Sequence, residues 1–119
     1  MSDVIGPAQI EHAIRECSNR LAKSIPIRSE RMTNKRAAER DYRRAYDLAY
    51  LNAEGSVEDR KAHARIATEE LHDAMDVAEV IYKEAEALAR AIEKELDALR
   101  SVGASIRSTY AVAGRGEGA

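Results

Sequence analysis

Apolar and small residues recur with a heptad period along the C-terminal half of the chain. From Leu71 to Tyr110 they alternate at steps of four and three. This spacing keeps one face of an α-helix apolar and is typical of coiled coils. We therefore predict a helix over about residues 68–110. Its helix-packing seam is predicted to include Leu71, Met75, Tyr82, Ile92, Leu96, Leu99 and Ile106.

The two flanks of this seam differ in polarity. One flank is charged and carries Glu79, Glu86, Glu93, Arg100 and Arg107. The other flank is largely apolar and carries Ala74, Ile81, Leu88 and Val102. A two-stranded coiled coil needs only a narrow seam. A seam widened on one side predicts two neighbouring helices.

Helix-breaking and helix-capping residues predict three further helices, over about residues 8–24, 29–53 and 57–67. Pro7 suits a first helical turn, and Pro26 predicts a break near residues 24–29. Gly55 suits a left-handed helix end, and Ser56 suits the N-cap of the next helix. The Gly-rich tail 114–119 has no means of burying surface and is predicted to be disordered.

These elements predict an all-α fold in a single helical domain over residues 1–113. Residues 29–53 are expected to fold back along residues 68–110 as a long antiparallel helical hairpin. The additional N-terminal helix, or a second copy of the chain, is expected to cover the exposed side. A homodimer is the oligomeric state that we predict.

Composition supports long helices, and the charge is segregated along the chain. The 119 residues include no Phe and no Trp, and the net charge is −2. Residues 15–44 hold ten basic and four acidic side chains, whereas residues 54–97 hold thirteen acidic and six basic ones. An antiparallel hairpin puts these two segments side by side. Each surface pair contributes little, but many pairs together favour one register.

The basic arm has two interpretations. Aromatic rings among basic side chains can stack bases and hold phosphates of single-stranded nucleic acid. Tyrosines at helical spacing beside alanines also form an ordinary packing seam, which is the interpretation that we favour. The candidate nucleic-acid contacts are Arg36, Arg40, Tyr42, Arg43, Arg44 and Tyr46.

The acidic arm also has two interpretations. A row of carboxylates can imitate the phosphates of DNA, and a solvated helix face explains the same residues more simply. Val77 and Val80 lie off the seam, where an apolar side chain is a docking point for a partner unless another helix covers it. The candidate partner surface consists of Val77, Val80, Glu79 and Glu86.

No residue pattern indicates catalysis. Gly-rich phosphate loops, nucleophile elbows and Cys/His clusters are missing from the sequence. Cys17 lies on an apolar stripe and is expected to be a small buried residue. Glu69 and His72 have the spacing of di-iron helices, but the motif is needed twice and occurs once. We expect no enzyme activity, no metal, no cofactor and no small-molecule substrate.

The sequence contains no run of about 18 apolar residues, which a membrane span requires, so no membrane association is expected. The N-terminus lacks the charged and apolar regions of a signal peptide. A single cysteine fits a reducing compartment. The expected location is the cytoplasm.

Residues Ala53–Thr68 and Leu99–Tyr110 resemble a family of short helical-hairpin proteins of tailed bacteriophages, particularly phages of actinobacteria. The resemblance covers roughly residues 35–113. It implies a bacterial host cell and a neighbourhood of replication and recombination genes, without an established activity. The leading hypothesis is a non-enzymatic phage accessory protein that binds a protein of DNA metabolism or host defence. The alternatives are a single-strand binder, an acidic DNA mimic and a structural protein of the virion.

Overall fold

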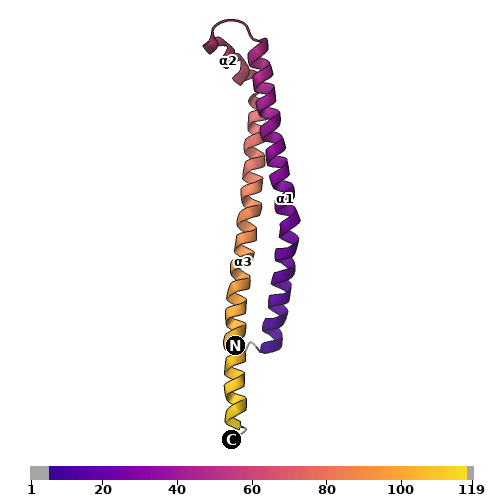
Figure 1. The fold of residues 1–119 in the computed structure, drawn as a ribbon, viewed down its shortest axis with the longest axis vertical. Helices are drawn as coiled ribbons and strands as arrows, with labels where there is room; N and C mark the ends of the chain where they lie inside the picture. The colour runs from indigo at the N-terminus through magenta and orange to yellow at the C-terminus, as the bar shows by residue number, and fades with distance from the viewer. Residues whose placement is uncertain (1–5, 118–119) are drawn as a thin grey trace, which may run out of the picture. The chain divides into compact units, whose positions relative to one another are not determined.

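Three α-helices make up the described chain. They are α1 (Pro7–Asn52), α2 (Val57–Ala67) and α3 (Glu69–Glu117) (Figure 1). The computed structural model describes the backbone of residues 6–117 and the side chains of residues 6–114. No strand occurs within residues 6–117, so the predicted all-α class is confirmed.

α1 runs through Pro26 without interruption, so the predicted break near residues 24–29 is wrong. A proline inside a helix removes one backbone hydrogen bond and costs roughly 3 kcal/mol. Side chains of α1 pack against α3 on both sides of the proline, at Leu21 before it and at Lys35 after it. Ser24 also donates its hydroxyl to the carbonyl oxygen of Leu21 at 2.6 Å. These contacts hold the helix together across a position that local preference would interrupt.

The turn between α1 and α2 is the one that the sequence predicts. Gly55 takes a φ of +108°, a conformation that side chains with a Cβ rarely adopt. Ser56 is the N-cap of α2 and forms a capping box with Asp59, with hydrogen bonds of 3.1 and 3.2 Å. α2 occupies the predicted range 57–67. Thr68 separates it from α3, and its buried hydroxyl donates to the carbonyl oxygen of Ala64 at 2.7 Å.

The described chain divides into two compact units, to both of which α1 and α3 contribute. Unit 1 contains the residues up to Ile25 and those from Ala87 onward, and unit 2 contains Pro26–Glu86. The sequence predicted a single domain. On α1 the division falls at Pro26, inside the segment where the sequence predicted a helix break.

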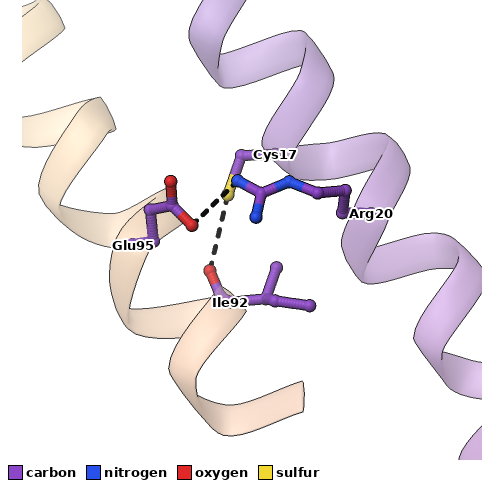
Figure 2. Close-up of polar contacts among 4 residues, drawn as sticks. All are labelled: Cys17, Arg20, Ile92 and Glu95. Atoms are coloured by element: carbon purple, nitrogen blue, oxygen red, sulfur yellow. Dashed lines mark hydrogen bonds and ion pairs between the residues drawn. The ribbon is translucent and has the colours of Figure 1, made fainter. Parts of the chain in front are cut away.

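Unit 1 holds the apolar core. Cys17, Ile92 and Leu96 are buried, and Ile14, Leu21 and Leu99 pack against them. Higher-numbered residues of α1 meet lower-numbered residues of α3, so the two helices run antiparallel within this unit (Figure 1). Near the N-terminus of α1, Ile10 and Ile14 approach Gly103, which has no side chain to keep them away. Figure 2 shows the thiol of Cys17 turned toward Ile92, beside the contact of Arg20 with Glu95.

Unit 2 pairs α1 with the first part of α3, also antiparallel, through contacts of aromatic rings. The ring of Tyr42 lies edge-on to His72, with centroids 5.2 Å apart. The ammonium of Lys35 lies 5.8 Å from the ring centroid of Tyr82. Near the α1–α2 turn, the guanidinium of Arg60 lies 5.9 Å from the ring centroid of Tyr50. The hairpin that the sequence predicts is therefore present in this unit.

The predicted seam of α3 matches its less exposed side. Ile92 and Leu96 are buried, and Met75, Tyr82, Leu99 and Ile106 are half-buried. Leu71, at the beginning of the seam, is exposed. Of the predicted tail, residues 114–117 belong to α3, and residues 118 and 119 lie outside the described residues.

Candidate interaction surfaces

The described chain leaves more large apolar side chains exposed than it buries. Ile10, Ile92 and Leu96 are the large aliphatic side chains that are buried among residues 6–114. Fourteen large hydrophobic residues in the same part of the chain are exposed. Single exposed apolar residues are normal, whereas neighbouring ones on one face mark interaction sites. The exposed apolar residues that lie together on one helix face are therefore the candidates for an interaction site.

One such gathering lies on α3 within unit 2, and we call it the α3 patch. It is a shallow surface hollow of about 310 Å³ lined by Asp76, Val77, Val80, Ile81 and Glu84. The exposed fractions of Val77, Val80 and Ile81 are 58%, 55% and 41%. Val77 and Val80 were predicted as partner contacts, and both are exposed. Ile81 was expected to be covered by a neighbouring helix, and it completes the patch instead.

The other two predicted partner residues, Glu79 and Glu86, are half-buried and engaged within the chain. Glu79 lies 3.2 Å from the ammonium of Lys83. Glu86 accepts a hydrogen bond from the hydroxyl of Tyr82. This hydrogen bond, together with desolvation, raises the pKa of the Tyr82 phenol. The two glutamates therefore offer less free charge to a partner than Glu84, which is exposed and forms no ion pair within the described residues.

Four arginines of α1 form a second surface, which we call the arginine face. Arg36, Arg40, Arg43 and Arg44 are all exposed. Lys35, next to them in the chain, forms an ion pair with Glu39, because its ammonium lies 2.9 Å from the Glu39 carboxylate. That contact raises the pKa of Lys35 and lowers the pKa of Glu39.

The tyrosines of the predicted nucleic-acid site do not join the arginine face. Tyr42 and Tyr46 are half-buried, with ring centroids 6.1 Å apart. Tyr42 also contacts His72 of α3. This arrangement is the packing seam of the simpler interpretation, so the rings are not displayed for stacking on bases.

A larger hollow of about 400 Å³, which no sequence pattern predicted, lies near the α2–α3 junction of unit 2. Its lining residues are Tyr42, Arg65, Ile66, Thr68, Glu69, His72 and Asp73. His72 lies 3.5 Å from Asp76, and the possible ligand atoms of His72, Asp73 and Asp76 all lie within 4.8 Å of one another. All three side chains are exposed, and such groups commonly form on charged helices without an ion. Residues i, i+1 and i+4 of one helix produce this proximity by spacing alone.

Comparisons with protein families, with characterised proteins and with solved structures found no match to this chain. None of the helices in the described part of the chain combines the length and the apolar character that crossing a bilayer requires.

Proposed function

We propose that this chain is a non-catalytic binding protein whose α3 patch docks an amphipathic helix of a partner protein. The observation that carries the proposal is the exposure of Val77, Val80 and Ile81 together in one hollow. Their spacing of three and four residues presents an apolar stripe of the kind that receives helix anchors. Covering three aliphatic side chains that are about half exposed contributes a few kcal/mol.

The border of the patch supports a basic partner. Asp76 and Glu84 line the hollow on either side of the valines, and Asp73 lies one turn before Val77. Lysine or arginine beside the apolar anchors of the partner would complement these carboxylates and steer the encounter. Two copies of this chain that met patch to patch would bring like charges together. Charge therefore favours a different protein as the occupant.

The cellular setting of the proposal rests on the resemblance of residues 53–68 and 99–110 to phage helical-hairpin proteins. We accordingly propose a partner from phage replication or recombination, or from host defence, inside the bacterial cell. The exposure of the α3 patch supports binding as such, and the resemblance supports the setting.

A pair of synthetic helical peptides tests the docking mode. Both peptides carry the same apolar stripe, and they differ only in having lysine or glutamate at the flanking positions. Calorimetry is expected to show binding of the lysine peptide and at least tenfold weaker binding of the glutamate peptide. Val80→Asp should abolish binding, because it puts a charge where the apolar anchor docks.

Leu51→Asp serves as the matched control, since Leu51 is 70% exposed on α1 in the same unit. This substitution should leave binding unchanged. Equal binding of both peptides, or equal loss in the two variants, would show that the α3 patch is not a docking site. Binding of neither peptide would reject the proposed partner chemistry.

A further inference from the structure

We infer that the arginine face is a second and independent binding surface, which takes the phosphate backbone of nucleic acid without reading its sequence. Arg36, Arg40, Arg43 and Arg44 follow one another at helical spacings of four, three and one residues. At 1.5 Å per residue they span roughly 12 Å along one side of α1. Arginine remains charged at all physiological pH values, and its planar fork donates two hydrogen bonds to one phosphate.

None of these four charges is held in a close ion pair with a described residue, although, together with the hydrogen bond from Lys35, the charges of Arg43 and Arg36 help to lower the pKa of Glu39. The ion pairs within 4.0 Å that involve neighbouring bases are Lys35 with Glu39 and Arg31 with Glu30. None of the four arginines forms an ion pair with a carboxylate of the described residues. Asp47 follows Arg43 by four residues and ends the basic run. Glu39 and Asp41 also lie three or four residues from members of the run, but no carboxylate of the described residues comes within 4.0 Å of the four guanidinium groups, which are therefore available to an external anion.

The surroundings of the arginine face favour nucleic acid over a lipid surface. A helix that lies on a membrane needs an apolar face opposite its basic one. On α1 the opposite side packs against α3 through residues such as Lys35 and Tyr42. Because α3 covers that side, it cannot enter lipid. The ligand that the arginines favour is therefore a polyanion in solution.

The burial of the tyrosines decides how nucleic acid is bound. Proteins that prefer single strands stack bases on exposed aromatic rings. Here Tyr42 and Tyr46 are held in the packing of unit 2. Contacts from the arginine face are then made to phosphates alone. Such contacts bind duplex and single-stranded DNA alike, weakly and with a strong dependence on salt.

Fluorescence anisotropy with labelled duplex and single-stranded oligonucleotides of mixed sequence, over a series of salt concentrations, tests this inference. Non-specific binding of this kind has dissociation constants of roughly 10⁻⁴ to 10⁻⁶ M, and four phosphate contacts give a slope of log K against log salt of about −3.6 on duplex. Arg40→Gln/Arg43→Gln should reduce the magnitude of that slope by about 1.8 and weaken binding at least tenfold at low salt. Arg40→Lys/Arg43→Lys keeps the charge and should retain most of the slope.

The matched control is Arg15→Gln/Arg100→Gln, which removes two exposed arginines of unit 1 and changes the net charge equally. Circular dichroism confirms that each variant remains helical. Retention of binding in the control and loss in the Arg40/Arg43 variant supports the inference. Equal loss in both variants, a slope near zero, or tighter binding of polyglutamate than of the oligonucleotides would overturn it. Tighter binding of polyglutamate would indicate an acidic protein as the ligand of this face.

Discussion

The thiol of Cys17 on α1 donates a hydrogen bond to the backbone carbonyl oxygen of Ile92 on α3, with a sulfur–oxygen distance of 3.5 Å. The two residues are 75 positions apart in the sequence, and both are buried. One turn along α1, the guanidinium of Arg20 lies 2.8 Å from the carboxylate of Glu95. This salt bridge is solvent-exposed, so it helps to set the register more than it stabilises the pair. The burial of Cys17 against Ile92 belongs to the apolar core that stabilises unit 1.

Ile92→Ala should therefore destabilise the protein strongly. Truncating a buried isoleucine removes its packing and leaves a cavity, which together cost roughly 2–5 kcal/mol. Ile66→Ala is the matched control, because Ile66 is 77% exposed on α2 and should change stability by less than about 0.5 kcal/mol. Urea denaturation followed by circular dichroism measures both values. Similar stabilities for the two variants would contradict the assignment of the core.

Gly103→Ala should stabilise the protein. A Cβ at this position would lie 3.4 Å from the Cδ1 atom of Ile14 and 3.8 Å from the Cγ1 atom of Ile10, which are ordinary contacts. Alanine in place of glycine inside a helix gains up to about 1 kcal/mol in helix propensity. Gly103→Leu, in contrast, should destabilise, because the larger side chain has to displace both isoleucines. A rise in melting temperature for the first variant and a fall for the second are expected, and a fall for both would contradict the packing described here.

Position-specific signals made much of this fold predictable. The Gly55–Ser56 turn determines the start of α2 through backbone conformation and capping, which depend on adjacent residues alone. The heptad period identified the less exposed side of α3 from Met75 to Ile106. Both features depend on residues that are close together in the sequence, so they can be predicted without knowing which distant segments pack together.

The features that the sequence did not predict depend on distant contacts. Pro26 has a local preference for a helix break, and packing on α3 before and after it overrides that preference. Leu71 fits the heptad period but is exposed, because the period indicates a face and does not supply a neighbour for it. The packing of Tyr42 was the favoured interpretation of the sequence, but its particular partner, His72, depends on the pairing of α1 with α3 and was not predicted.

Tyr82 should titrate above the ordinary phenol pKa of about 10. Its hydrogen bond to Glu86 and its partial burial both favour the neutral phenol, and the nearby Arg28 and Lys35 oppose them only in part. Because folding raises the pKa of Tyr82, its neutral phenol stabilises the folded state. This stabilisation is complete at a pH below the pKa of Tyr82 in the unfolded chain, and it is lost as the pH rises through the higher pKa of the folded protein. An ultraviolet absorbance titration should show that Glu86→Gln lowers the pKa of the latest-titrating tyrosine. An unchanged titration curve would show that Glu86 does not act on Tyr82.

The homodimer remains a prediction, and unit 1 offers a surface for it. Leu88 and Val102 are 62% and 43% exposed on the apolar flank of α3, which α1 leaves uncovered. Ala91 and Ala98 lie between them at helical spacing, and the charge of Glu95, which also lies between them, is paired with Arg20 of the same chain. Light scattering at micromolar concentration should give a dimer for the wild type and a monomer for Leu88→Glu. Ile66→Glu should remain dimeric, and a monomeric wild type would reject the prediction.

Methyl NMR tests binding through the α3 patch most directly. The lysine-flanked helical peptide is titrated into protein labelled at its valine, leucine and isoleucine methyl groups. We predict saturable shifts confined to Val77, Val80, Ile81 and their immediate neighbours, with Leu48 and Leu51 of α1 unchanged. Absence of shifts at the two valines, or larger shifts at Leu48 and Leu51, would contradict binding through this patch.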